Sequence, residues 1–412
     1  MRVGSELRSL CATALVALIA ACAQEDSGGG AREGAEEFAG VRLAEPEAVY
    51  PQGFSAAFTV RELDDGTVLV ADPIGQALVR VDFATASADT VGGYGEGPSE
   101  YRQPDAVWPL PDGGTLLVDL GNGRLTELDA ELEFGRTHPY SQGDPEDTTL
   151  MVVIPQGVDD RGRVYFSGVP VEENDSLPVL RLDLGTGELD TIARYRLPAT
   201  RRDTITDARG RQRQRVSMVP LSPTDAWGVG ADGRVALARA AGAPMSNAPT
   251  ELGYFLEWID EDGTSTPGPT VPYEPVPIGE AEKEEWTDRR DELGGGLRLE
   301  AATGDSAAAV IGKRGGPRPV NEDLDRYAWP EVLPAFYPDR VAVDPLGRAW
   351  VRRYAEAGAV TRYDVFSATG ERAETVELGV GRRVVGFGEG SLYAIQMDDL
   401  GRQRLERYAI PM

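Results

Sequence analysis

Apolar and polar positions recur along this chain as a repeated unit of short strands. The unit has an apolar strand, a turn containing Asp and Gly, a second apolar strand, a short gap and a third strand. The first copy has strands at 58–62, 67–72 and 78–82, and the second has strands at 105–110, 115–119 and 124–128. Gly-containing turns between short apolar strands are typical of antiparallel hairpins.

Six copies of the unit can be aligned on one turn glycine each: Gly66, Gly113, Gly162, Gly233, Gly347 and Gly390. Uninterrupted neighbours lie 43 to 49 residues apart, and two spacings are stretched to 71 and 114 residues. Several copies add a fourth strand, at 88–92, 189–194 and 373–378. A period of about 45 residues suits the four-stranded blades of a β-propeller. We therefore expect an all-β, six-bladed β-propeller of antiparallel blades.

The sixth copy has no fourth strand, because the chain ends at Met412. The early segment 40–43 precedes the first copy and has no other place in the repeat. We expect this N-terminal strand to complete the last blade, which closes the ring and removes exposed sheet edges.

One blade carries a more specific pattern. It has the Gly-rich run 93–97, then Tyr101 and Pro104 before an inner strand, and afterwards Val118-Asp119 and Asn122-Gly-Arg124. This stretch resembles an NHL-type repeat. The resemblance implies a six-bladed ring whose inner strands line a central channel. Lyases, lactonases and pure binding proteins all use such rings, so the fold alone assigns no chemistry.

Two insertions interrupt the repeat. The first, at about 197–224, holds six Arg and forms a local positive patch that either pairs with nearby carboxylates or binds an anion. The second, at about 275–334, includes a charged segment at 280–293 that predicts a helix, followed by an aromatic run. Long insertions in compact folds often serve as lids, or else pack as decorations. The candidate ligand-binding residues there are Trp286, Tyr327, Trp329 and Phe336.

The chain has a net charge of −27, with 68 acidic and 41 basic residues. Such a surface repels phosphate backbones, so the sequence predicts no nucleic-acid partner.

The N-terminus resembles a bacterial lipoprotein signal. Arg2 and Arg8 precede an apolar run from Leu10 to Ala21, which is too short to span a bilayer, and the run ends Ile19-Ala-Ala-Cys22. Residues 1–21 are therefore expected to be removed, Cys22 lipidated, 22–37 a flexible tether and 38–412 the propeller. The resemblance implies attachment to a membrane in the cell envelope. Ala23 follows the cysteine, which favours the outer membrane where two membranes exist.

Few residues offer catalytic chemistry. His138 is the one histidine, and Cys11 would leave with the signal, so multi-histidine and Cys/His zinc sites do not arise within one chain. No cofactor is required by the sequence, although Ca²⁺ could use oxygen ligands, for which Asp105, Gln156 and Asp344 are the candidates. Structural turn caps are the simpler interpretation of these three residues.

Three functions remain open at this stage. The first is a tethered module that binds a small molecule or a protein through one face. The second is a Ca²⁺-dependent hydrolase or lyase with carboxylates in the channel, and the third is a structural component of an envelope complex. The absence of a convincing catalytic set favours the first.

Overall fold

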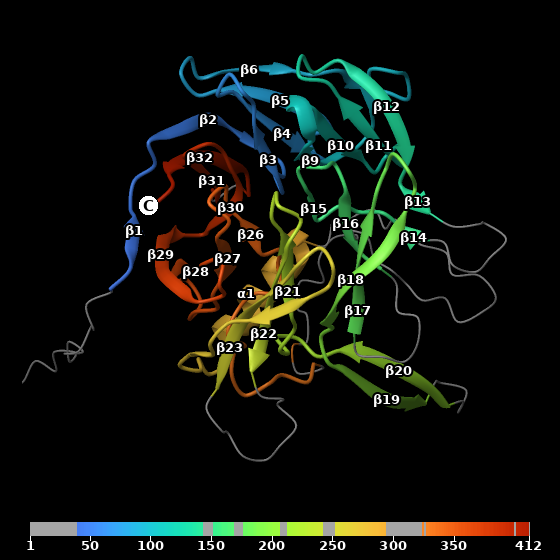
Figure 1. Ribbon diagram of the computed structural model, residues 1–412. Helices are drawn as coiled ribbons and strands as arrows, with labels where there is room; N and C mark the ends of the chain where they lie inside the picture. Colours follow the sequence, from blue (N-terminus) through green and yellow to red (C-terminus); the bar gives the residue numbers. More distant parts are fainter. Residues whose placement is uncertain are drawn as a thin grey trace, which may run out of the picture. The chain divides into compact units, whose positions relative to one another are not determined.

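The computed structural model describes residues 39–142, 151–168, 176–206, 212–241, 252–293, 324, 327–398 and 401–411. Within the compact unit Gly40–Met412, six antiparallel sheets are arranged around a common centre (Figure 1). Their inner strands contact one another in cyclic order, β3, β9, β15, β21, β26 and β30. The predicted all-β, six-bladed propeller is confirmed.

Blades 1 to 5 each have four strands in chain order from the centre outward, and blade 6 has three such strands followed by an N-terminal strand. Blades 1 to 3 contain, in turn, β3 (Val60–Glu62), β4 (Val68–Asp72), β5 (Ala77–Asp82) and β6 (Ser87–Thr90); β9 (Pro104–Pro109), β10 (Thr115–Asp119), β11 (Arg124–Leu128) and β12 (Phe134–Pro139); and β15 (Gly157–Val158), β16 (Val164–Ser167), β17 (Ser176–Leu182) and β18 (Leu189–Arg196).

Blades 4 to 6 follow the same plan. They contain β21 (Ala226–Val229), β22 (Val235–Ala241), β23 (Gly253–Ile259) and β24 (Ser265–Pro267), with β25 (Val271–Pro272) also on β23; β26 (Ala342–Val343), β27 (Ala349–Arg352), β28 (Val360–Phe366) and β29 (Arg372–Val380); and β30 (Arg382–Phe387), β31 (Ser391–Met397) and β32 (Gln403–Ala409).

The N-terminal segment closes the ring with two strands, drawn in blue beside the red C-terminal blades in Figure 1. Strand β2 (Ala48–Phe54) is the outer strand of blade 6, where it pairs antiparallel with β32. Strand β1 (Val41–Leu43) adds in parallel to β29 of blade 5. Closure by an N-terminal strand is therefore confirmed, but residues 41–43 do not occupy the expected place, because β2 already fills the edge of blade 6.

Shorter elements lie outside the blades. They are the parallel pair β7 (Gly93–Tyr94) and β8 (Glu100–Tyr101), the pair β13 (Ser141–Gln142) and β14 (Met151–Val152), the hairpin β19 (Thr200–Thr206) and β20 (Gln212–Met218), a 3-10 turn (Pro111–Gly113) and the helix α1 (Glu280–Leu293). The third copy of the repeat predicts an inner strand at 152–157. In the structure this stretch is divided between β14 and β15, and Pro155, which has no N–H to donate, lies between them. The predicted helix at 280–293 is confirmed.

Aspartates at the ends of two second strands fix the approach to the inner strands. The carboxylate of Asp72 accepts hydrogen bonds from the backbone N–H groups of Ser55, Ala56 and Gly75 at 2.7–3.0 Å. Asp119 accepts from Arg102 and Gln103 in the same way, at 3.1 and 3.0 Å. In blades 1 and 2 this aspartate thus ties the blade to the segment that enters it.

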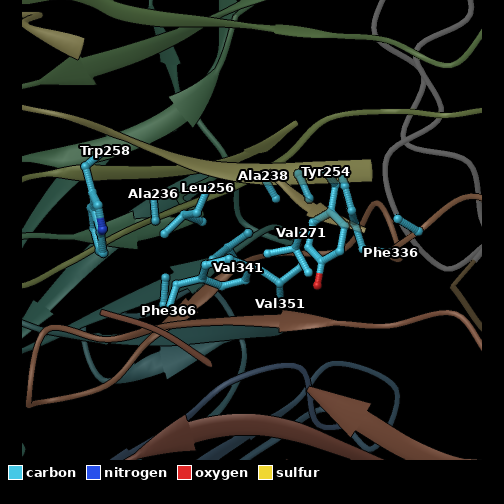
Figure 2. Close-up of a cluster of buried hydrophobic side chains, with 13 residues drawn as sticks. Ala236, Ala238, Tyr254, Leu256, Trp258, Val271, Phe336, Val341, Val351 and Phe366 are labelled. Atoms are coloured by element: carbon cyan, nitrogen blue, oxygen red, sulfur yellow. The ribbon is translucent and has the colours of Figure 1, made fainter. Parts of the chain in front are cut away.

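Apolar side chains fill the spaces between neighbouring blades. Figure 2 shows the cluster between blades 4 and 5, where Tyr254, Leu256 and Phe366 are fully buried. Close to the axis the inner strands approach so tightly that some positions require glycine. A Cβ on Gly228 of β21 would lie 1.7 Å from the carbonyl oxygen of Val341.

Candidate ligand-binding cavity

A cavity of about 1000 Å³ lies between α1, the segment 337–361 and the ends of the blade 6 strands. Ligand pockets in proteins commonly measure 300–1,000 Å³. Its walls mix apolar and charged groups: Phe58, Trp286, Tyr354, Ile395 and Met397 lie there together with Arg352, Arg383, Asp339 and Glu284. Met218, at the end of the first insertion, also reaches this cavity. Both insertions of the repeat therefore contribute to one site.

Carboxylates of α1 attach the helix to the loop after β27. Glu282 accepts a hydrogen bond from the backbone N–H of Ala357 at 3.1 Å, and Glu285 accepts one from Gly358 at 3.3 Å. Lys283 pairs with Glu280 at 2.6 Å on the helix itself. The helix is thus placed over the cavity by bonds to main-chain atoms, which do not depend on the loop's side chains.

Three of the four predicted ligand-binding residues come together. The rings of Trp286, Tyr327 and Trp329 pack edge to face with centroids 5.3–5.7 Å apart, and Trp286 lines the cavity. Edge-to-face packing is a preferred arrangement of aromatic rings. Phe336 lies elsewhere: it is 3% exposed and packs on Tyr254 in the core between blades 4 and 5. Ligand binding by these residues stays a prediction.

A second aromatic pair was not anticipated from the sequence. Tyr337 stacks on Tyr354 with ring centroids 3.6 Å apart. The guanidinium carbons of Arg289 and Arg352 lie 4.2 and 4.3 Å from the Tyr337 ring centre, within range of cation–π attraction. Burial raises the pKa of Tyr337, so this phenol stays protonated at neutral pH. The pair sits where segment 337–361 meets α1, a contact that no local sequence pattern marks.

The arginines of the cavity differ in their partners. Arg353 donates to the buried carboxylate of Asp364 at 2.8 Å and to the carbonyl oxygen of Ala335 at 3.0 Å. Arg352 approaches Asp339 at 3.5 Å. Arg383 donates to the carbonyl oxygen of Ala57 at 3.1 Å, with its guanidinium carbon 5.9 Å from the Phe58 ring.

The three candidate calcium ligands lie on or beside the inner strands of three different blades. Asp344, at the turn after β26, already accepts hydrogen bonds from Leu346, Arg348 and Trp350 at 2.8–3.0 Å, which is the arrangement of a turn cap. Gln156 donates to the Ser167 hydroxyl at 3.3 Å. Asp105 stands at the start of β9, and burial raises its pKa to about 6. Among the described residues no three His, Cys, Asp or Glu gather as metal ligands would.

His138 lies on the outer strand of blade 2, away from the inner strands. Its Nε2 is 2.6 Å from Glu127 on the neighbouring strand β11, and its side chain is 11% exposed. This contact gives the imidazole a structural role at the rim of the blade.

Cys22 and the rest of the predicted signal and tether, up to residue 37, lie outside the described residues. In the described part of the chain, no helix has the length and apolar character needed to cross a membrane.

No protein-family model matches the chain, and no curated protein matches it. Solved structures of other proteins resemble it in fold. A gluconolactonase from Xanthomonas campestris is 11% identical, with 92% of this chain and 99% of that chain covered and a TM-score of 0.41. The calcium-binding protein regucalcin from Agrobacterium tumefaciens is 9% identical, with 89% and 95% covered and a TM-score of 0.40.

Virginiamycin B lyase from Staphylococcus aureus is 8% identical, with 89% of this chain and 99% of that chain covered and a TM-score of 0.37. The functions named for these three proteins differ, and likeness at this level carries no argument about activity. The propeller assignment rests on the sheets of this chain.

Proposed function

We propose that this protein is a lipid-anchored, extracytoplasmic propeller that binds a small molecule in the cavity beneath α1. The observation that carries the proposal is the cavity itself, which is of ligand size and combines aromatic walls with a few charged groups. A protein partner would instead call for a broad apolar patch. The large apolar side chains most exposed in the described residues are scattered, and two of them, Met218 and Val380, line this cavity.

The membrane anchor is proposed from the sequence around Cys22, which resembles a lipobox and is followed by a Gly-rich tether. The proposed location is the cell envelope, at the outer membrane where two membranes exist. Labelled palmitate should enter the wild-type protein and the Cys11→Ser variant, and should not enter Cys22→Ser. Equal labelling of all three would remove the anchor from the proposal.

We also propose, from the sequence resemblance of one blade, that the propeller is of the NHL-repeat type. In its support, blades 1 and 2 both place an Asp at the end of the second strand, and both carboxylates bind the backbone that enters the blade. This proposal concerns how the blade is built and assigns no activity to the protein.

Binding is proposed in preference to calcium-dependent catalysis because the candidate oxygen ligands do not fit one ion. Asp105 and Gln156 lie where inner strands begin, whereas Asp344 follows the end of β26. The oxygens of Asp344 are moreover engaged by backbone N–H groups, Arg348 and Trp350. A calcium ion would have to displace those donors.

The cavity can be tested with the neutral fluorescent probe N-phenyl-1-naphthylamine. The predicted mature chain, from residue 22 onward, would carry Cys22→Ser and be made in the cytosol without the signal segment, so that neither lipid nor detergent competes for the probe. Ala359 lines the cavity, so Ala359→Trp should reduce binding at least about tenfold by filling it. The matched control is Ala84→Trp in an exposed turn of blade 1. Equal binding by wild type and both variants, or no binding by wild type, would refute the proposed site.

A further inference from the structure

The side chain of Arg340 crosses the centre of the ring. Arg340 precedes β26 of blade 5, yet its guanidinium carbon lies 4.8 Å from the ring centre of Trp108, which belongs to blade 2. In a ring of six, blade 2 is opposite blade 5. The same guanidinium also reaches the carbonyl oxygen of Val385 in blade 6, at 3.5 Å. A group from blade 5 that contacts blades 2 and 6 must occupy the central channel.

A second cation lies beside it. Arg383 is two residues before Val385 on β30, and it lines the cavity beneath α1. Asp339, next to Arg340, also lines the cavity, but its carboxylate lies 3.5 Å from Arg352. Three guanidinium groups, those of Arg340, Arg352 and Arg383, therefore share this region with the carboxylate of Asp339. On the blade side of the cavity these guanidinium groups outnumber the carboxylate of Asp339, whereas the other carboxylates of the lining come from α1 and the loop after β27: Glu284, Glu285, Asp288 and Glu356.

Arg340 retains hydrogen-bonding capacity. A guanidinium has five N–H donors, and the described residues provide Arg340 with one long hydrogen bond, to Val385, and with no carboxylate within 4 Å. Burial and the positive charge of Arg383 lower the pKa of Arg340 to about 10, so the side chain remains charged at neutral pH. A buried guanidinium without a carboxylate partner costs free energy, and an anion bound to Arg340 would recover it.

We infer that Arg340 and Arg383 form an anion subsite where the cavity meets the central channel. It would receive the carboxylate or phosphate group of an organic anion whose apolar body lies along Phe58, Ile395 and Met397. Planar guanidinium groups suit such oxyanions because they donate two parallel hydrogen bonds. The inference rests on the proposed function and adds the chemical class of the ligand.

The test compares three probes of one shape by calorimetry on the Cys22→Ser chain: 2-naphthoate, 2-naphthyl phosphate and the neutral 2-naphthamide. At least one anion should bind about tenfold or more tightly than the amide, as expected for hydrogen bonds to charged groups. The tighter of the two anions identifies the head group. Arg340→Gln and Arg383→Gln should each remove this preference, and Arg340→Lys should retain part of it.

Arg80→Gln is the matched control, because Arg80 belongs to an exposed ion pair with Asp65 on blade 1. It should keep the full anion preference, and circular dichroism would establish that every variant is folded. Equal binding of anions and amide by wild type, or an unchanged preference in Arg340→Gln and Arg383→Gln, would overturn the subsite. Binding of N-phenyl-1-naphthylamine alone would overturn the subsite while leaving the proposed function in place.

Discussion

Arg353 is predicted to stabilise the fold, in contrast to Arg340 of the proposed subsite. Its partner Asp364 is fully buried and accepts hydrogen bonds from Arg353, Tyr254 and Thr375. Arg353→Met removes the charge that compensates this carboxylate, and the next cation, Arg372, is 3.8 Å away with its side chain 42% exposed. Breaking a buried pair on one side costs about 3–5 kcal/mol.

This loss of free energy should appear as a measurable decrease of the melting temperature. The compact unit Gly40–Met412 holds roughly 370 residues, and at about 2.1 cal/mol/K per residue its unfolding entropy is about 0.8 kcal/mol/K. Arg353→Met should therefore lower the melting temperature by about 4–6 °C in scanning calorimetry. The double variant Arg353→Met/Asp364→Asn should melt higher than Arg353→Met, because the uncompensated charge is gone. A decrease of the melting temperature by less than 1 °C, or a double variant that melts at a lower temperature than Arg353→Met, would refute the reasoning.

Two further predictions concern positions near the axis. Gly228→Ala should cost at least about 3 kcal/mol in urea unfolding, because its Cβ meets the Val341 carbonyl; Gly93→Ala, with no atom nearer than 4.0 Å, should cost under about 1 kcal/mol, and equal costs would contradict the account. Burial raises the pKa of Asp105 to about 6. The free-energy cost of holding this carboxyl group ionised in the folded protein therefore grows as the pH rises from about 4 to 6. Asp105→Asn should stabilise by up to about 3 kcal/mol at pH 7.5 and not below pH 4, whereas a pH-independent difference would contradict this.

The blade count could be predicted because its signals are local. Each turn needs a residue in the left-handed region, and all six predicted turn glycines have positive φ, from 72° to 131°. The segment 280–293 was likewise recognisable as a helix from its own composition. Strand pairing between chain ends is not local: Val41 lies beside Val376, and nothing in either segment distinguishes that partner from the edge of blade 6.

The candidate site was predicted in part for the same reason. Trp286, Tyr327 and Trp329 belong to the second insertion, and the sequence marked them as aromatic residues outside the repeat. Phe336 has the same local character, yet it enters the core beside Tyr254. Which aromatic side chain faces the core depends on how the insertion docks. Tyr337, Tyr354 and Arg383 belong to or adjoin the blades, so they lie outside both insertions.

The arginines show most directly why a site of this kind needs the tertiary structure. Asp339-Arg340 and Arg352-Arg353 are similar short charged segments that flank the first two strands of blade 5. Arg353 meets the carboxylate of Asp364 from β28, whereas Arg340 is directed across the channel to Trp108. A buried charge that has its counterion stabilises the fold, and one without it is available to a ligand. The subsite thus depends on where Asp364 lies, eleven residues from one arginine and twenty-four from the other.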